Sequence, residues 1–397
     1  MVKMEKFSEF ITEEKDEPYK IVCFYHTGDS SRDVSKDDHL GMMNTMNKSA
    51  KAAGITMHYV DYNGVFLSNK NGKVYINYFP IDDKTGEYIP PDSKGGKIKY
   101  AEPIEIDKEN TLFLYRDLPS DRKHWTDMLK ALEFRGYFLL NSFVCNSICG
   151  SKYLTDVYLR EAGLRTPKTV RISHSEDSER AFKELKSDFP IILKLSLGTQ
   201  TGIGVVKIDN MRTLHATVQM VLMLDKKLPL LVQEFIEIEY DIRAMVLHDE
   251  VIGVMKRNVI EGSDFRSNVS LGAESEKMKL TELEREVSIK ASKAVGGILT
   301  GVDLIPSKDR EKEPPYVLEV NSNPGLSGIE KTNPGITEMV FKYLQTNYVT
   351  NTEDAHDKPT PKPEIRYFLL SFLFSFKYGA SAIGIDDDTV LPVLFNE

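Results

Sequence analysis

Short apolar runs alternate with amphipathic stretches along most of the chain. At its start, apolar segments 20–25 and 55–60 flank a helical repeat at 37–53, which Gly54 ends. This strand–helix–strand order predicts a parallel sheet. Further strands are predicted at 111–115 and 137–140, and a further helix at 124–134.

Residues 71–106 have a different character, because turn-forming pairs interrupt them. Asn71-Gly72, Pro90-Pro91 and Gly95-Gly96 break the segment, and one apolar strand is predicted at 74–79. We interpret 71–106 as a hairpin-like insertion into the first domain.

Helices and strands alternate again from residue 143 onward. Ser175 is placed to cap a helix at 175–185, and Thr281 and Glu284 have capping-box spacing. Helices are also predicted at 152–162 and 281–295, and strands at 191–195, 205–208, 230–235, 241–247, 251–256, 301–305 and 316–321.

The composition changes again near residue 350. Residues 349–364 are polar and rich in proline, which predicts a linker, and 365–397 begin with an apolar, aromatic stretch. The predicted organisation is an N-terminal domain at 1–142 with its insertion at 71–106, two further subdomains at 143–232 and 233–348, the linker, and an apolar tail at 365–397.

Length and charge narrow the functional classes. The chain has 397 residues and a net charge of −9, which argues against a general affinity for nucleic acid. No apolar stretch is long enough to span a membrane, and the N-terminus lacks a signal-peptide core, so we expect a cytoplasmic protein. Cys23, Cys145 and Cys149 form neither a disulfide framework nor a zinc pattern.

The segment around Glu319 offers candidate metal ligands. Glu319 and Asn321 project from one face of the strand at 316–321, which leaves Leu318 and Val320 facing the core. Asp303 lies in another strand, and the three side chains supply the oxygen ligands that Mg²⁺ prefers. The alternative interpretation is a solvated strand face.

A second candidate site combines a strand lysine with a glycine-rich loop. Lys194 precedes the loop 198–204, whose glycines allow backbone N–H groups to approach phosphate oxygens closely. The loop lacks the Gly-Lys-Ser/Thr of a Walker motif, and a tight hairpin turn would explain its glycines equally well.

Three arginines in order along the chain form a third group. Arg243, Arg257 and Arg266 could stabilise charge on a phosphoryl group in transfer. Asp241 shares a strand face with Arg243. Surface ion pairs would explain any one of these arginines, but less readily the ordered set.

Taken in order, these motifs resemble ATP-grasp enzymes of the RimK type, which add glutamate to a carboxylate. The similarity runs from Lys152 to Tyr343, nearly half of the chain. It rests on Lys194-Leu195 with Gly198-Thr199-Gln200, Gly202-Ile203-Gly204, Leu231-Val232-Gln233-Glu234-Phe235-Ile236, Asp241-Ile242-Arg243, Asp264-Phe265-Arg266-Ser267-Asn268, Gly301-Val302-Asp303, Glu319-Val320-Asn321, Pro324-Gly325-Leu326 and Gly328-Ile329-Glu330-Lys331-Thr332.

The resemblance implies an α/β fold in which two α+β subdomains clasp ATP, preceded by an α/β pre-ATP-grasp domain with a parallel sheet. It also implies roles for single residues. The implied ATP-binding residues are Lys152, Lys194, Gly202, Gln233, Glu234, Phe235, Ile236, Asp241, Arg266, Ser267 and Asn268, the catalytic ones Arg243, Arg257, Arg266 and Asn268, and the magnesium ligands Asp303, Glu319 and Asn321.

The implied activity is ATP-dependent ligation of a carboxylate to an amine through an acyl-phosphate, with two Mg²⁺ ions for which Mn²⁺ could substitute. The expected partners are ATP, an amino acid with glutamate favoured, and a carboxylate acceptor on a peptide, protein or small acid. No nucleic acid or membrane is expected, and a homo-oligomer is compatible with the family. Alternatives are an ATP-binding regulatory or scaffold module and a simple phosphotransferase.

The sequence departs from the family pattern in a few places. Thr201 lengthens the glycine-rich loop by one residue, and the loop between Arg257 and Phe265 is slightly longer than expected. The resemblance places Asp241 near the ribose, and the segment between Ile236 and Asp241 is short.

Overall fold

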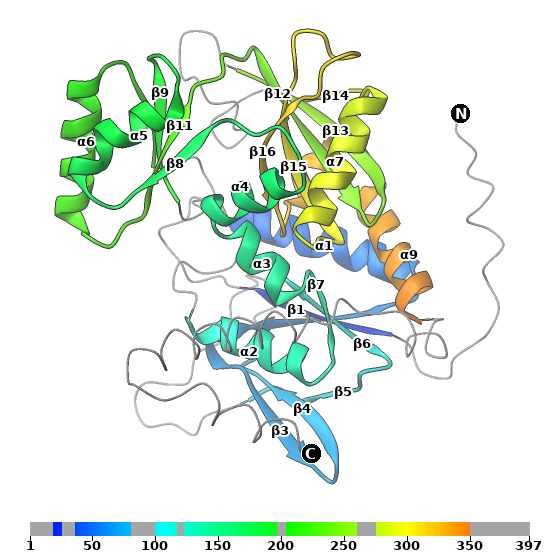
Figure 1. The fold of residues 1–397 in the computed structure, drawn as a ribbon. Helices are drawn as coiled ribbons and strands as arrows, with labels where there is room; N and C mark the ends of the chain where they lie inside the picture. Colours follow the sequence, from blue (N-terminus) through cyan, green and yellow to red (C-terminus); the bar gives the residue numbers. More distant parts are fainter. Residues whose placement is uncertain are drawn as a thin grey trace, which may run out of the picture. The chain divides into compact units, whose positions relative to one another are not determined.

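The computed structural model describes residues 19–25, 36–80, 100–116, 123–196, 204–259 and 275–349. The chain divides into two compact units, 1–346 and 347–397, and the first contains nearly all of the described residues (Figure 1). The expectations for most of the glycine-rich loop including Gly202, for Arg266, Ser267 and Asn268, and for the linker and tail lie outside the described residues.

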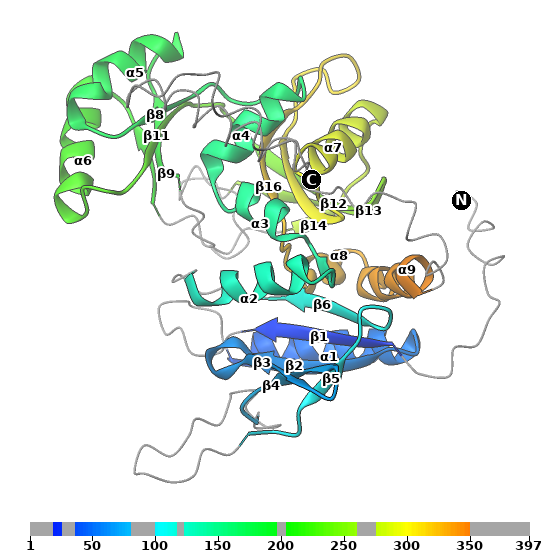
Figure 2. The same ribbon diagram turned by 60° about the horizontal axis from the view of Figure 1, so that its bottom comes forward.

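A parallel sheet forms near the N-terminus, as the strand–helix–strand pattern predicts. Its strand order is β2-β1-β6-β7, so the strand order changes direction beside β1. Helices α1 and α2 cover opposite faces (Figures 1 and 2). The bounds are β1 Lys20–Tyr25, α1 Lys36–Ala52, β2 Thr56–Asp61, β6 Thr111–Tyr115, α2 Lys123–Phe134 and β7 Phe138–Leu140, and a short 3-10 helix, η2, covers Tyr62–Gly64.

The predicted hairpin packs beside this sheet. Strands β3 (Phe66–Lys70) and β4 (Lys73–Asn77) are antiparallel, and β5 (Ile104–Ile106) pairs with β4. Asn71 and Gly72 form the turn with φ of 53° and 78°, which the Asn-Gly pair tolerates well. The hairpin begins earlier than predicted, because β3 precedes residue 71.

A four-stranded antiparallel sheet follows, with the order β10-β9-β11-β8. Two helices pack on one of its faces around Leu214, Val218 and Leu185. The bounds are β8 Thr169–Ile172, α5 Ser178–Leu185, β9 Ile191–Leu195, β10 Val205–Ile208, α6 Met211–Leu224 and β11 Leu230–Glu234.

The prediction that Ser175 caps the helix at 175–185 is wrong. A 3-10 turn, η3, occupies Ser175–Asp177, and α5 begins at Ser178 without a side-chain cap. In this turn the Ser175 carbonyl oxygen accepts a hydrogen bond from the Ser178 hydroxyl at 2.7 Å. The capping box predicted for Thr281 and Glu284 is confirmed.

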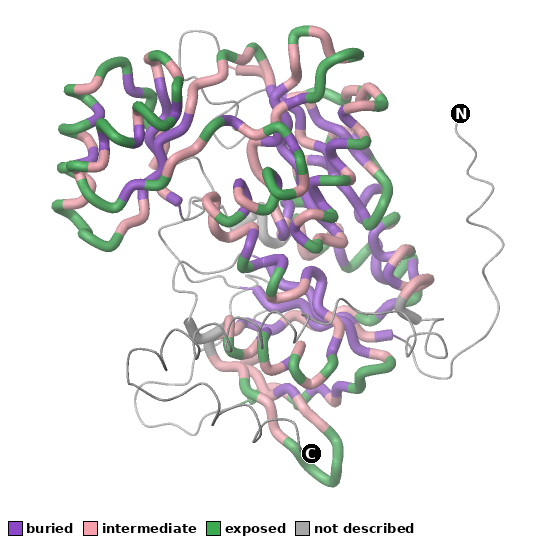
Figure 3. The backbone as a smooth tube through the Cα atoms, in the orientation of Figure 1, coloured by how far each residue is buried: buried purple, intermediate pink, exposed green. Residues whose placement is uncertain are grey.

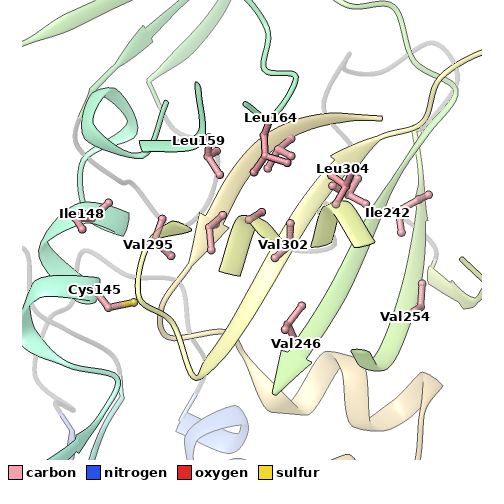
Figure 4. Packing of buried hydrophobic residues seen from close by; sticks show 14 residues of the cluster. Cys145, Ile148, Leu159, Leu164, Ile242, Val246, Val254, Val295, Val302 and Leu304 are labelled. Atoms are coloured by element: carbon pink, nitrogen blue, oxygen red, sulfur yellow. The ribbon is translucent and has the colours of Figure 1, made fainter. Parts of the chain in front are cut away.

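A five-stranded antiparallel sheet has the order β14-β13-β12-β15-β16. Its apolar face packs on α3, α4 and α7 through the cluster in Figure 4, which includes Ile148, Leu159, Val302 and Leu304. The bounds are α3 Phe143–Cys149, α4 Lys152–Glu161, β12 Tyr240–Leu247, β13 Glu250–Asn258, β14 Ser275–Lys277, α7 Glu282–Ala294, β15 Leu299–Ile305, β16 Tyr316–Asn321, α8 Leu326–Thr332 and α9 Ile336–Val349.

Buried positions run along the strands, whereas exposed ones line the outer sides of the helices (Figure 3). No helix in the described part of the chain is both long and apolar enough to cross a membrane. The predicted metal ligands Asp303, Glu319 and Asn321 lie on the five-stranded sheet, on the face opposite the apolar cluster, because alternate residues of a strand face opposite ways.

Candidate active site

The predicted metal ligands lie on neighbouring strands. Asp303 on β15 is the direct partner of Glu319 on β16, and Gly301 is the partner of Asn321. A register shift follows this pair, since Leu304 aligns with Val317 and leaves Leu318 as an extra residue. Such a bulge re-aims the side chains on either side of it.

Because of this bulge, the prediction that Leu318 faces the core together with Val320 is wrong. Val317 and Val320 are both buried, at 0% and 2% exposure, whereas Leu318 is only partly buried. Leu318 was predicted to face the core because side chains alternate strictly along a strand without a bulge. Glu319 and Asn321 remain on the face opposite the cluster of Val317 and Val320.

Two arginines surround Asp303. Arg243 donates from Nε and Nη2 to its two carboxylate oxygens at 2.7 and 2.6 Å. Arg257 Nη2 lies 3.1 Å from Asp303 Oδ2. Burial would raise the pKa of Asp303, but the charges and hydrogen bonds of both arginines outweigh it and lower that pKa.

Arg257 is itself buried and bound to two carboxylates. It donates from Nε and Nη2 to the two oxygens of Asp241, both at 2.6 Å, and the side chains of Arg257 and Asp241 are each only 4% exposed. Arg257 therefore lies between Asp241 and Asp303 and contacts both carboxylates. Asp241 faces Arg257 directly across β12 and β13.

Glu319 is close to a lysine from another element. Lys152 begins α4, and its Nζ lies 3.5 Å from Glu319 Oε2. Burial acts to raise the pKa of Glu319, but attraction by Lys152 and Arg243, together with a hydrogen bond from Asn321, lowers it overall. Glu319 is therefore a carboxylate at neutral pH, as a metal ligand must be.

Lys194 is buried in the middle of the four-stranded sheet. Its ammonium donates to Gln233 Oε1 at 2.9 Å, and Gln233 Nε2 donates to Thr169 Oγ1 at 2.7 Å. Among the described residues, no carboxylate forms a salt bridge with Lys194. A buried ammonium that is hydrogen-bonded to a neutral amide is well suited to an incoming polyanion.

The environment of Lys194 lowers its pKa to about 8. Burial is the main cause, and repulsion by Lys152 adds to it. Glu319 and Asp156 act in the opposite direction. Lys194 therefore loses its proton as the pH rises above about 8, and a phosphate bound beside it would favour the protonated form.

Nucleotide affinity should for this reason decrease at alkaline pH. We expect the dissociation constant for ATP to rise by up to about tenfold per pH unit above pH 8, because binding becomes linked to proton uptake. Titration of a fluorescent ATP analogue between pH 7 and 9.5 measures this. Lys194→Arg, which stays charged, should show a flat profile, and a flat profile in the unaltered protein would contradict the prediction.

The implied ATP-binding residues Glu234, Phe235 and Ile236 lie at the end of β11. Glu234 accepts a hydrogen bond from the backbone N–H of Lys168 at 2.8 Å, so its side chain stabilises the neighbouring segment. The Nζ of Lys207 lies 4.4 Å from the ring centroid of Phe235. Ile236 follows as a partly buried residue. These residues remain proposed contacts of ATP.

The donor set fits Mg²⁺ held together with phosphates. The described residues contain no group of three or more His, Cys, Asp or Glu that could hold a metal alone. Asp303 and Glu319 supply two carboxylates and Asn321 an amide oxygen, which is the small protein contribution typical of Mg²⁺ sites completed by phosphate oxygens. Lys152 and Lys194 would contact those phosphates.

Two further residues near the site were missed by sequence reasoning. Arg116 follows β6 and hydrogen-bonds Asn323, and Asn141 follows β7 and hydrogen-bonds Ser322. Each polar residue comes directly after a buried strand of a parallel sheet, where ligands and functional groups gather. That position was the available signal.

Comparison with known proteins identifies the family of the chain. A family model for the RimK-like ATP-grasp domain matches residues 150–340. A "Probable alpha-L-glutamate ligase" of Coxiella burnetii is 38% identical over 225 residues, which cover 56% of this chain and 72% of that protein.

Solved structures show the same fold at low sequence identity. A Chryseobacterium gregarium RiPP-associated ATP-grasp ligase in complex with ADP, and a leader and core peptide, has a TM-score of 0.58 at 14% identity and covers 82% of this chain and 96% of its own. The ATP-grasp ligase PsnB complexed with minimal precursor, Mg and ADP has a TM-score of 0.51 at 18% identity, with coverage of 82% and 98%. The predicted fold class is thereby confirmed.

Proposed function

The chain belongs to the RimK-like ATP-grasp family of ATP-dependent amino-acid ligases, and from this membership we propose that it joins glutamate, or another amino acid, to a carboxylate through an acyl-phosphate. The acceptor carboxylate belongs to a peptide, a protein or a small acid. The direct pairing of Asp303 with Glu319, with Lys152 at 3.5 Å from Glu319, is the observation that supports this most strongly.

The reaction proceeds in two steps. An oxygen of the acceptor carboxylate attacks the γ-phosphorus of ATP, the bond from that phosphorus to the bridging oxygen breaks, and ADP leaves. The amine then attacks the acyl carbon, the carbon–oxygen bond to phosphate breaks, and the amine releases a proton. Mg²⁺, when bound, neutralises charge on the phosphate oxygens.

The protein residues position these groups and balance their charge. Lys152 and Lys194 hold phosphate oxygens, and Asp303, Glu319 and Asn321 are the proposed ligands for two Mg²⁺ ions, which Mn²⁺ could replace. Arg243 reaches the same face of the sheet and can stabilise charge on the transferred phosphoryl group. Arg266, Ser267 and Asn268 remain proposed contacts of the triphosphate and the reacting carboxylate.

Arg257 has a different proposed role from Arg243. Its guanidinium is buried, donates hydrogen bonds to Asp241 and forms a salt bridge with Asp303. We assign it the positioning of Asp303 instead of direct contact with substrate. Both carboxylate oxygens of Asp241 already accept hydrogen bonds from Arg257. A ribose hydroxyl could therefore contact Asp241 only by donating a second hydrogen bond to one of these oxygens.

The substrate assignment is supported by the relatives. The Coxiella burnetii protein is named a probable alpha-L-glutamate ligase, and two solved neighbours are described with a minimal precursor and with a leader and core peptide. Glutamate as the amine and a peptide carboxylate as the acceptor are therefore the first combination to test.

The proposal predicts sustained ADP release that requires both an acid and an amine. Purified protein with Mg²⁺ and ATP should be supplied with twenty amino acids in turn and with a panel of peptides ending in free carboxylates. We expect repeated turnovers of ADP release only when both substrates are present, and a product whose mass exceeds that of the acceptor by one amino-acid residue. Repeated turnover with either substrate alone would indicate phosphotransfer or hydrolysis, and nucleotide binding without ADP release would indicate a binding module.

A further inference from the structure

Strand β16 pairs with only one neighbouring strand at the end that bears the proposed ligands. It is an edge strand, because the sheet order ends β15-β16. Beyond the bulge at Leu318, Glu319, Val320 and Asn321 pair with β15. A short edge segment of this kind is paired on one side only, so its end needs contacts from elsewhere to stay in place.

Those contacts come from the turn that follows. Asn141 Nδ2 donates to the Ser322 carbonyl oxygen at 2.6 Å, and Asn141 Oδ1 accepts from the N–H groups of Ile298 and Leu299 at 2.7 and 3.1 Å. The Ser322 hydroxyl donates to Asn146 Oδ1 at 3.0 Å. The residue after Asn321 is thereby bound to segments outside β16.

Arg116 binds the next two residues of the turn. Its Nη1 donates to Asn323 Oδ1 at 2.6 Å and to the Pro324 carbonyl oxygen at 2.9 Å. The backbone N–H of Arg116 donates to the Phe24 carbonyl oxygen at 2.7 Å, at the carboxyl end of β1. The side chain is buried, and it connects the parallel sheet to a turn more than two hundred residues later.

The turn after β16 is also packed against strand β15. Gly301 is the partner of Asn321, and a Cβ built on Gly301 would lie 3.1 Å from Pro324 Cβ. Pro324 therefore packs directly against the backbone of β15, the strand that contains Asp303. A displacement of the turn changes the spacing between the two strands that supply the proposed metal ligands.

We propose that Arg116 is a positioning residue for the magnesium site. By binding Asn323 and Pro324 it fixes the end of β16 and so the places of Asn321 and Glu319. This assignment rests on the magnesium site of the proposed function. Metal ligands need accurate placement, and residues that orient them affect metal affinity strongly even without touching the ion.

The proposal separates metal binding from nucleotide binding. The lysines that would contact phosphates are held by groups outside β16, since the backbone N–H of Lys152 donates to the carbonyl oxygen of Ser196 and Lys194 hydrogen-bonds Gln233. Loss of Arg116 should weaken the response to Mg²⁺ while leaving metal-free nucleotide binding unchanged. A residue with a merely structural role would lower thermal stability without this separation.

The test measures binding of a non-hydrolysable ATP analogue by calorimetry, first with EDTA and then over a series of Mg²⁺ concentrations. For Arg116→Ala we expect the half-saturating Mg²⁺ concentration to rise by about tenfold, with an unchanged dissociation constant in EDTA. Arg135→Ala is the matched control, since Arg135 lies near the same sheet and hydrogen-bonds Asn69 at the surface, at 3.4 Å.

Asn323→Ala provides an independent variant that removes one of the two bonds. It should shift the Mg²⁺ requirement in the same direction but less, and Arg116→Ala/Asn323→Ala should be no worse than Arg116→Ala alone, because the two residues share one interaction. If Arg116→Ala does not fold, Arg116→Lys and Asn323→Ala decide the question.

An unchanged Mg²⁺ requirement in the folded variants would overturn the proposal, as would an equal loss of binding in EDTA. The unaltered protein tests the magnesium site separately. If its nucleotide binding does not respond to Mg²⁺, the proposed magnesium site fails. If it responds but no ligation occurs, only the ligase chemistry fails, and the role of Arg116 is still decided by the binding data.

Discussion

Glu319→Gln is expected to reduce the rate of ligation by about 10³-fold, comparable to the loss of a group that stabilises charge in a transition state. The substitution preserves shape but replaces an anionic oxygen with an NH₂ group that cannot bind Mg²⁺. Glu319 also faces Lys152 and Asp303, so the local charge balance changes by one unit. ADP release in the presence of both substrates measures the effect.

The variant should remain folded. Glu319 lies at the solvent-accessible edge of the sheet, with its side chain 31% exposed. Glu313→Gln is the matched control, because Glu313 is an exposed carboxylate whose ion-pair partner, Arg165, is 3.8 Å away. Full activity in Glu319→Gln, with unfolding temperatures alike in both variants, would rule out the metal assignment.

Arg257→Met is expected to lower the free energy of unfolding by about 3–5 kcal/mol, the range for removing one partner of a buried ion pair. Methionine has a similar length but leaves Asp241 buried and without its counter-charge. Asp303 keeps Arg243, so most of the effect should arise from Asp241. Chemical denaturation at neutral pH measures the change.

Lys256→Met is the control on the adjacent residue of the same strand. Lys256 binds Glu276 at 2.7 Å, but both side chains are partly exposed, and the loss should stay below about 1 kcal/mol. Adding Asp241→Asn to Arg257→Met should restore part of the lost stability, because the uncompensated charge is removed. Equal effects of Arg257→Met and Lys256→Met would contradict the buried-pair interpretation.

Most strands and long helices could be predicted because their apolar periodicity is strong. The strand at 241–247 and the capping box at Thr281 and Glu284 are examples. Helix α3 and strand β14 were missed, since seven and three residues are too few to establish a period. The bulge at Leu318 was missed because register depends on the partner strand, which a single sequence does not contain.

The order of motifs along the chain predicted the family, but it could not predict which groups pair. Arg243 and Arg257 were both candidates for contact with phosphate. Only the pairing of β12 with β13 and β15 shows that Arg243 faces Asp303 and that Arg257 faces Asp241. Arg116 and Asn141 belong to no motif, and their contacts join residues more than 150 positions apart.

Helix α4 packs on the five-stranded sheet and is hydrogen-bonded, at its first residue, to the segment that follows β9 of the four-stranded sheet. Leu159 of α4 packs in the apolar cluster of the five-stranded sheet, yet the backbone N–H of Lys152 donates to the carbonyl oxygen of Ser196, next to Leu195 at the end of β9, at 2.8 Å. Any rotation between the two antiparallel sheets that preserves this bond must turn about an axis passing close to Lys152. In such a rotation the largest displacements would occur far from that residue, and the distance between Lys152 and Lys194 would change little.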